Sequence, residues 1–114
     1  MKTNEEQLNK WTAKYYRLVF QQAFYVCRDR YVAERIAEQT FLAAYKNIRK
    51  IRKSDDVKGW IMQAARYFIL KEVYSSWELG ETVTEKFRLS ESLDMETIHA
   101  LIVQYEEYDG NNSK

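Results

Sequence analysis

The sequence predicts an all-α fold, a small bundle of three main helices followed by an acidic, partly helical C-terminal segment. Apolar residues recur three and four positions apart and nowhere alternate for long, which is the spacing of helices. The chain has 114 residues, of which 46% are hydrophobic, three are glycine and none is proline. This length and composition indicate one small folded domain and exclude both a multidomain enzyme and a wholly disordered chain.

The first helix is expected over about residues 4–27, where one stripe of apolar side chains faces the core. Arg28-Asp29-Arg30 interrupts that stripe and indicates a short connection between two antiparallel helices. The stripe consists of Leu8, Trp11, Tyr15, Leu18, Val19 and Val26.

The second helix is expected over about residues 32–50, where another apolar stripe recurs at helical spacing. Residues 49–56 then carry charges of both signs and end in Ser54-Asp55-Asp56, which can cap a following helix. We therefore predict a loop and an N-cap after the second helix. The second stripe consists of Ala33, Ala37, Phe41, Ala44, Ile48 and Ile51.

The third helix is expected from near Asp56 to about Tyr74, and residues 75–80 end it with serines and a glycine. Trp60 and Phe68 fall on its apolar face, so we expect both in the core. Tyr67, Tyr74 and Trp77 fall off the stripe or at its end, so core packing and a binding surface both remain open for them. The face consists of Val57, Trp60, Ile61, Ala64, Ala65 and Phe68.

Charge divides the chain into two halves that the net charge of +1 conceals. Residues 1–77 carry 15 basic and 8 acidic side chains, whereas residues 78–114 carry 3 basic and 9 acidic ones. The first half suits an anionic partner and the second repels one. We expect a helical domain over residues 1–77 and an acidic linker or C-terminal helix over residues 78–114. The second region has a weaker apolar stripe of Leu93, Ile98, Leu101, Ile102 and Tyr105 before a polar tail.

No residue pattern in the sequence predicts catalysis, a metal site or a cofactor. One cysteine, Cys27, follows three apolar residues and is interpreted as buried, while His99 is the single histidine. Glu34 and Glu38 lie four apart, a spacing typical of a solvent-facing helix side. The chain contains no glycine-rich phosphate loop and no Cys-x-x-Cys. It also lacks an apolar run long enough for a membrane span or a signal-peptide core, so we expect a cytoplasmic binding protein without membrane contact.

The chain combines cations with aromatic rings near the junction of the second and third helices. Single-stranded nucleic acid is bound by this combination, because Lys and Arg pair with phosphates while unstacked bases lie on rings. The cations at the junction are Arg49, Lys50, Arg52, Lys53 and Lys58, and the aromatics that follow are Trp60, Tyr67, Phe68, Tyr74 and Trp77.

Two blocks of the sequence carry a resemblance to a known family. Residues 33–46 read AERIAEQTFLAAYK, and residues 59–68 read GWIMQAARYF after a charged segment. These blocks resemble region 2 of bacterial sigma-70-type factors, above all the extracytoplasmic-function group, which reads roughly AEDLVQETFLRAWR and then WLYRIARN. The similarity covers about residues 8–75, with both blocks in order and at similar separation.

The resemblance implies that the second helix docks on the clamp helices of the RNA polymerase beta-prime subunit. The third helix and its exit would then capture flipped bases of the melted promoter minus-ten element. The positions that would face polymerase are Glu34, Arg35, Glu38, Gln39 and Leu42, and those that match the DNA-facing stretch are Arg66, Tyr67, Lys71 and Tyr74. Phe41 and Trp60 match apolar family positions.

The sequence departs from the family pattern where function would lie. Arg35 replaces an acidic residue, and Glu38-Gln39 inverts a Gln-Glu pair. Lys71 replaces an aspartate, and Tyr74-Ser75 replaces arginines. Tyr67 replaces an asparagine, which exchanges a base-edge hydrogen bonder for a stacking surface. Fold positions therefore match the family better than contact positions do.

The chain lacks the second helix-turn-helix domain, region 4, which reads the minus-35 element in the family. Either residues 78–114 are the interdomain linker of a fragment, or the chain supplies region 2 alone and relies on a partner for region 4. An anti-sigma factor is a further partner that the resemblance allows. The alternative function is a helical interaction or regulatory module that keeps this fold without promoter recognition. In each case the C-terminal stripe would pack on the domain or on a neighbour, with acidic side chains near the DNA position.

Overall fold

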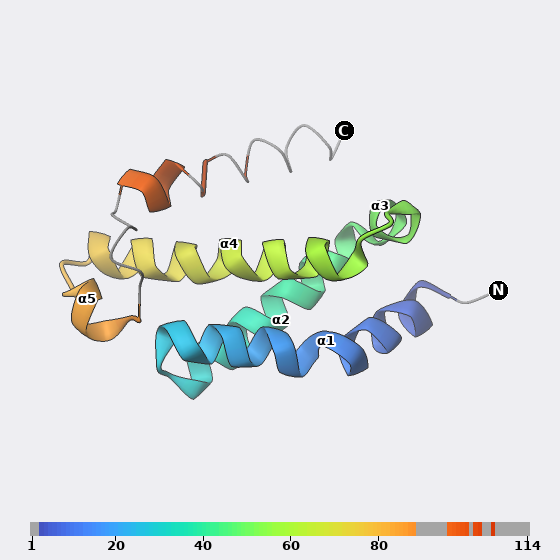
Figure 1. The fold of residues 1–114 in the computed structure, drawn as a ribbon, viewed down its shortest axis with the longest axis horizontal. Coiled ribbons are helices and arrows are strands. Elements are labelled where there is room, and N and C mark those ends of the chain that lie inside the picture. The colour runs from blue at the N-terminus through green and yellow to red at the C-terminus, as the bar shows by residue number, and fades with distance from the viewer. Residues whose placement is uncertain (1–2, 89–95, 101, 104–105, 107–114) are drawn as a thin grey trace.

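The computed structural model describes residues 3–88, 96–100, 102–103 and 106, and it confirms the all-α bundle (Figure 1). Three long helices pack together, α1 (Asn4–Cys27), α2 (Arg30–Lys46) and α4 (Val57–Glu78). Two short helices accompany them, α3 (Ile48–Lys53) and α5 (Val83–Lys86). No strand occurs within the described part of the chain. No helix there is long and apolar enough to cross a membrane.

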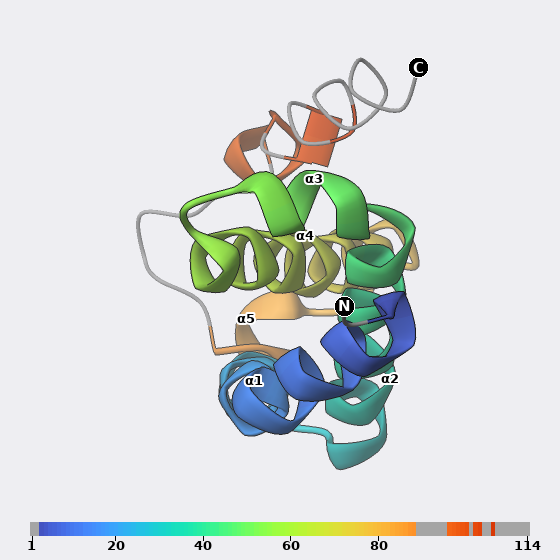
Figure 2. The same cartoon turned by 90° about the vertical axis from the view of Figure 1, so that its right-hand side faces the viewer.

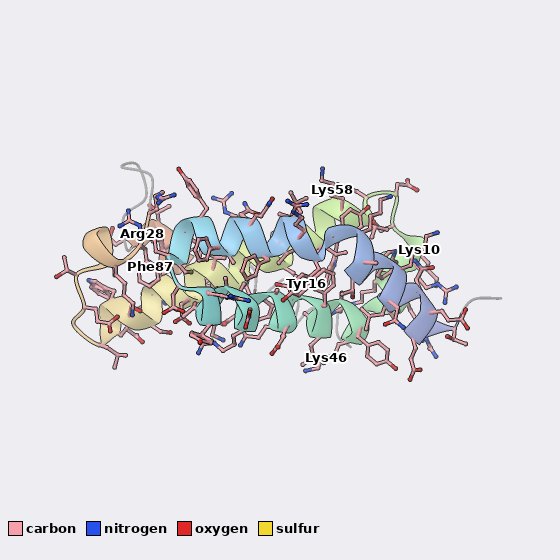
Figure 3. The ribbon with its side chains drawn as sticks, turned by 90° about the horizontal axis from the view of Figure 1, so that it is seen from below. Lys10, Tyr16, Arg28, Lys46, Lys58 and Phe87 are labelled. Carbon is pink, nitrogen blue, oxygen red and sulfur yellow. The ribbon has the colours of Figure 1, made fainter. Side chains whose placement is uncertain are left out.

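Helices α1 and α2 form an antiparallel pair, joined by a short turn in which the end of α1 and the start of α2 are both capped. Arg28 adopts a left-handed conformation with φ of 58°, and its backbone N–H donates to the Phe24 carbonyl at 2.9 Å. Asp29 Oδ1 then accepts from the backbone N–H groups of Tyr31 at 2.9 Å and Val32 at 3.1 Å. The predicted short connection is therefore confirmed, and α1 and α2 lie side by side (Figure 3).

The predicted loop after the second helix is wrong for residues 49–53, which are helical, whereas the predicted N-cap is confirmed at Asp56. The second helix ends at Lys46, where the Asn47 backbone N–H and side-chain Nδ2 both donate to the Ala43 carbonyl, at 3.1 and 2.9 Å. Ile48 and Ile51 are then buried by a new helix, α3, although both had been placed on the stripe of a single longer helix. Ile48 and Ile51 lie three positions apart, so both face the core from one side of α3, and the charged residues of α3 remain exposed.

The third long helix, α4, continues four residues beyond the predicted end at Tyr74. It begins after Asp56, whose Oδ1 accepts from the Gly59 N–H at 2.9 Å. A Cβ at position 59 would clash with that carboxyl group, so a larger residue there would displace the cap. Ser76 is buried within the last turn, and Gly80 follows with φ of 82°. The helix therefore stops at the glycine and not at the serines.

Two clusters of buried side chains form the core, and they correct part of the predicted one. Phe41 and Cys27 are buried as expected. Trp60 and Phe68 are only partly buried and pack at the edges of the clusters, because each lies beside the central apolar face of α4. Leu18, predicted on the α1 stripe, is 38% exposed. Ala23, Val19 and Trp11 carry the buried side of α1 instead, together with Cys27.

Part of the acidic C-terminal region packs on α4, on the side opposite α1 (Figures 1 and 2). Residues 96–100 and 102–103 are helical, and Ile98 and Ile102 are buried in the same cluster as Ile36 and Val73. Phe87, after α5, is 1% exposed in this cluster. We call residues 96–100, 102–103 and 106 the C-terminal cover. The expected positions Leu93, Leu101 and Tyr105 lie outside the described residues.

Candidate functional site

One side of α2 carries all the residues that were predicted to face polymerase. Arg35, Glu38, Gln39 and Leu42 are exposed and Glu34 is partly buried, whereas Ile36, Ala37, Thr40 and Phe41 between them are buried. Leu42 is 56% exposed, an unusual position for a leucine in the middle of a charged and polar face. This side of α2 is therefore a mainly polar surface that exposes one aliphatic side chain, Leu42, together with the rings of Tyr31 and Tyr45.

Two of these residues form ion pairs within the chain. Glu34 Oε1 accepts from Arg30 Nε at 3.2 Å, one helical turn earlier. Arg35 Nη2 donates to Glu72 Oε2 on α4 at 2.7 Å. Arg35 of α2 is therefore held by an acidic residue of the neighbouring helix.

A groove of about 370 Å³ connects the exposed side of α2 with α4 and the C-terminal cover. Leu42 and Gln39 line it from α2, and Tyr67 and Phe68 line it from α4. Glu106 of the cover closes one side. Two predicted polymerase-facing residues, Gln39 and Leu42, therefore share one groove with the predicted DNA-facing residue Tyr67, although they come from separate sequence blocks.

The predicted basic group lies mainly on α3, at one end of α4. Arg49, Lys50, Arg52 and Lys53 are exposed, and Lys58 follows in the first turn of α4. Arg52 Nη1 donates to Asn4 Oδ1 at 3.1 Å, which links this group to the start of α1. Because Ile48 and Ile51 fix α3 on the core, the cations project from a folded surface rather than from the loop that the sequence predicted.

The predicted DNA-facing residues of α4 are spread along the helix. Lys58 and Trp77 lie about 28 Å apart along the axis, at 1.5 Å per residue. Arg66 is exposed between them. Trp77 is 46% exposed and its ring centroid is 5.6 Å from that of Tyr74. The structure therefore places the α3 cations and the Tyr74–Trp77 pair at opposite ends of α4 (Figure 1).

The central part of the predicted DNA-facing surface contacts the C-terminal cover. The Tyr67 hydroxyl donates to Glu106 Oε1 at 2.7 Å, and Lys71 Nζ lies 3.7 Å from the same oxygen. Lys71 Nζ also donates to the Tyr67 hydroxyl at 3.2 Å. One turn further, the Tyr74 ring stacks on His99 with centroids 5.0 Å apart. The cover thus occupies the positions at which the resemblance predicts bases and phosphates.

These contacts perturb two ionisable groups. Burial, and then the hydrogen bond to Glu106, raises the pKa of Tyr67. The hydrogen bond to Tyr67 raises the pKa of Lys71, with a smaller contribution from Glu106. Both shifts favour a protonated tyrosine and a charged lysine at neutral pH, which is the protonation state of the observed network.

Sequence reasoning missed Glu106 and His99 as contact residues. The signal that could have found them is the C-terminal apolar stripe. Ile98 and Ile102 of that stripe are buried in the core, and their packing determines which neighbouring side chains contact α4. Within the described part of the chain, no group of three or more metal-ligating side chains occurs. No family model, curated protein or solved structure matches this chain. Its function is therefore inferred from the residues and their geometry.

Proposed function

We propose that this chain is a sigma region 2-like domain of transcription initiation. It contacts the beta-prime clamp helices of core RNA polymerase through α2 and the melted strand of the promoter minus-ten element through α4. The observation that carries the proposal is the exposed side of α2, on which Leu42 is an exposed aliphatic side chain among charged and polar residues and two tyrosines. The two sequence blocks that resemble the family supply this side of α2 and the adjoining part of α4.

Leu42 supports a docking role because its exposure has a free-energy cost that a partner can recover. Burial of a leucine side chain stabilises a complex by roughly 1.5–3 kcal/mol relative to exposure. Glu38 and Gln39, one turn earlier, are exposed and can hydrogen bond at the rim of such a contact. A helix face of this kind suits the surface of a coiled coil.

DNA binding at α4 requires the C-terminal cover to move. A base that stacks on Tyr67 or Tyr74 takes the place of Glu106 or His99. Surface ion pairs such as Lys71–Glu106 contribute roughly 0–1 kcal/mol, and stacking of a base on a ring contributes about 1–3 kcal/mol. A nucleic-acid ligand can thus displace the Glu106 side chain while Ile98 and Ile102 stay buried, and the cations of α3 add long-range attraction for phosphates.

The test is capture of purified core RNA polymerase, or of its isolated beta-prime clamp helices, by the immobilised chain. Leu42→Asp should abolish capture because it places a charge at the apolar point of the contact. Leu79→Asp is the matched control, since Leu79 is 80% exposed beyond the end of α4. Capture by the wild type and the control but not by Leu42→Asp supports the proposal. Equal capture of all three, or of none, overturns it.

A second function, a helical interaction module without promoter recognition, is favoured by the contacts of α4 with its own chain. Glu106 engages Tyr67 and Lys71, and Glu72 engages Arg35. A salt titration on single-stranded DNA discriminates the two functions, because a DNA binder loses affinity steeply with salt. Replacement of Lys50, Arg52 and Lys53 by alanine should flatten that slope and weaken binding for all sequences alike. An unchanged slope would remove α3 from the DNA site, and absence of binding would favour the interaction module.

A further inference from the structure

The solvent-facing side of α1 carries a strip of residues that the proposed function does not use. Its members recur three and four positions apart along the helix, so they share one side of α1, and all of them are exposed. No acidic residue occurs between positions 7 and 28. Figure 3 shows Lys10 and Arg28 toward the two ends of this helix. We call Lys10, Lys14, Arg17, Gln21, Phe24 and Tyr25 the α1 strip.

The first half of the α1 strip is a row of three cations. At a rise of 1.5 Å per residue, Lys10 and Arg17 lie about 10 Å apart along the helix axis. Neither of these two takes part in an ion pair within the described part of the chain. Between them, the Lys14 ammonium lies 5.5 Å from the centroid of the Tyr15 ring. The row therefore attracts an anionic ligand along its length.

The cations of α3 extend this positive charge beyond the start of α1. Arg52 Nη1 of α3 donates to the side-chain oxygen of Asn4, the first residue of α1, at 3.1 Å. Trp11 of α1 lies in the same buried cluster as Ile48 and Ile51 of α3, so the two helices are held together at this end. The combined charge covers a longer path than a single carboxylate or phosphate group can contact. A polyanion is the complementary ligand.

The second half of the α1 strip exposes two aromatic rings beside an open groove of about 450 Å³. Phe24 is 46% exposed and Tyr25 is 58% exposed. The centroid of the Phe20 ring is 6.0 Å from that of Phe24, an offset arrangement that leaves part of the Phe24 ring uncovered. The Arg88 guanidinium lies 4.3 Å from the centroid of Tyr25, on one face of that ring. Both rings therefore retain surface on which a flat aromatic group can stack.

A row of cations that continues into open rings favours single-stranded nucleic acid over an acidic peptide. A strand pairs its regularly repeated phosphates with Lys and Arg and stacks its bases on exposed rings. A peptide gains most of its affinity from side chains that fill a pocket. The groove beside Phe24 includes none of the three cations, which lie on the convex surface of the helix. The cationic half thus offers charge without the pocket that a peptide needs.

An anionic membrane is a poorer ligand for the same helix. A helix that binds a lipid surface inserts its apolar face among the head groups. The apolar face of α1 is already buried in the bundle, where Trp11, Val19, Ala23 and Cys27 pack against the other helices. Insertion would require α1 to leave the core.

We propose that the α1 strip binds single-stranded nucleic acid. Phosphates pair with Lys10, Lys14 and Arg17, and bases stack on Phe24 and Tyr25. The strip shares its class of ligand with the proposed function but not its site, because it contains none of the residues assigned to polymerase or to DNA. Binding here also leaves the contact between Glu106 and Tyr67 in place, since the C-terminal cover packs on the side of α4 opposite α1.

The test is fluorescence anisotropy of labelled oligothymidine with the full chain at several salt concentrations. Lys14→Gln combined with Arg17→Gln should make the slope of log affinity against log salt shallower by about 1.4, because each phosphate contact on a single strand contributes about 0.7. Tyr25→Ser should weaken binding by about tenfold, the loss of one stacked base. Both losses should persist in the Glu106→Ala background. Circular dichroism and thermal melting establish that each variant is folded.

Two control variants on α2 match these substitutions. Arg30→Gln combined with Lys46→Gln removes two exposed cations, and Tyr31→Ser removes a ring that is 81% exposed. Each control should change oligothymidine affinity by less than about twofold. Losses as large in the controls as in the strip variants overturn the inference. A chain that shows the strip losses but captures no polymerase supports this inference while it overturns the proposed function, so the two fail separately.

Three other ligands provide results that would also overturn the inference. A DNA duplex that binds as tightly as oligothymidine, with no loss in Tyr25→Ser, would assign the α1 strip to duplex backbone. Polyglutamate that displaces oligothymidine at equal charge concentration would assign it to acidic protein segments. Phosphatidylserine vesicles that bind the wild type more tightly than oligothymidine does, but not the Lys14 and Arg17 double variant, would assign it to a membrane surface.

Discussion

The exposed sides of α2 and α4 adjoin along one groove but differ in what occupies them. On α2, Leu42 is 56% exposed and the residues near it project from the bundle. On α4, Tyr67, Lys71 and Tyr74 contact the C-terminal cover. The side of α2 predicted for polymerase is thus open at Leu42, whereas the central part of the surface predicted for DNA contacts an acidic segment of the same chain.

The difference shows that buried apolar residues of the C-terminal cover determine which polar residues of α4 are exposed. Ile98 and Ile102 are buried with the side chains of α1, α2 and α4, so they anchor the cover on the core. Glu106 and His99 then lie on α4 as a consequence of that packing. Occupation of the α4 surface therefore depends on core packing first and on charge second.

The largest expected effect comes from the core beneath the cover. Phe87→Ala should lower the free energy of unfolding by about 3–5 kcal/mol, because a phenylalanine that is 1% exposed leaves a cavity. Urea denaturation followed by circular dichroism measures the change. Leu79→Ala, at a residue 80% exposed, should stay within about 0.5 kcal/mol of wild type. A small effect of Phe87→Ala would show that the region after α4 does not belong to the core.

The thiol in the same core provides a test by pH. Burial, with help from Glu72 and Asp29, raises the pKa of Cys27 to about 12 from 9.0. Between these values the unfolded chain ionises and the folded chain does not, so the thiol's contribution to stability is complete below pH 9.0 and declines as pH rises toward 12. Wild type should lose more stability than Cys27→Ala between neutral pH and about pH 10. Equal losses would mean that Cys27 is accessible to solvent.

Removal of the acidic contact should open the α4 surface. Glu106→Ala should raise the affinity for labelled oligothymidine at low salt by up to about fivefold, the equivalent of an exposed ion pair. It should also lower the pKa of Tyr67, because a hydrogen-bonding carboxylate that raises this pKa is lost. Glu96→Ala, an exposed acid elsewhere in the cover, is the matched control for lost negative charge. The same gain for both variants would mean that net charge, and not occupation of Tyr67, controls affinity.

The smallest expected effect concerns the ion pair between Arg35 of α2 and Glu72 of α4. Arg35→Glu should cost about 1 kcal/mol or less in stability, because Arg35 is 53% exposed in its pair with Glu72. The double exchange Arg35→Glu with Glu72→Arg should recover that loss, and thermal melting of all three variants measures the coupling. Failure of the exchange to restore stability would show that Arg35 acts independently of α4.

Local patterns predicted the long helices well because apolar spacing reports directly which side of a helix is buried. The same patterns misplaced boundaries where a capping contact decides them. Asn47 ends α2 through bonds to Ala43, although the apolar stripe runs on to Ile51, and Ser76 extends the buried side of α4 past Tyr74. A stripe shows that residues are buried but not whether one helix or two bury them.

The candidate site divides along similar lines. The exposed side of α2 follows from helical periodicity once Phe41 is assigned to the core. The contact of Tyr67 with Glu106 joins positions 39 apart in sequence, so no local pattern contains it. The sequence supplied the apolar stripe that packs the cover, but the residues of α4 that the cover meets depend on tertiary packing.

The left-handed conformation of Arg28 shows that stability and surface chemistry make opposite demands at one position. Glycine adopts this conformation without the steric penalty that an L side chain suffers, which is roughly 1–2 kcal/mol. A glycine here would make the turn from α1 to α2 easier to form, but it would remove one of the two guanidinium groups beside Phe24. Arg28→Gly should therefore relieve that penalty and remove one positive charge from an open surface groove that Phe24 and Tyr25 also line. The residue thus marks a site where an engineer seeking a tougher scaffold and one seeking a binding surface would choose differently.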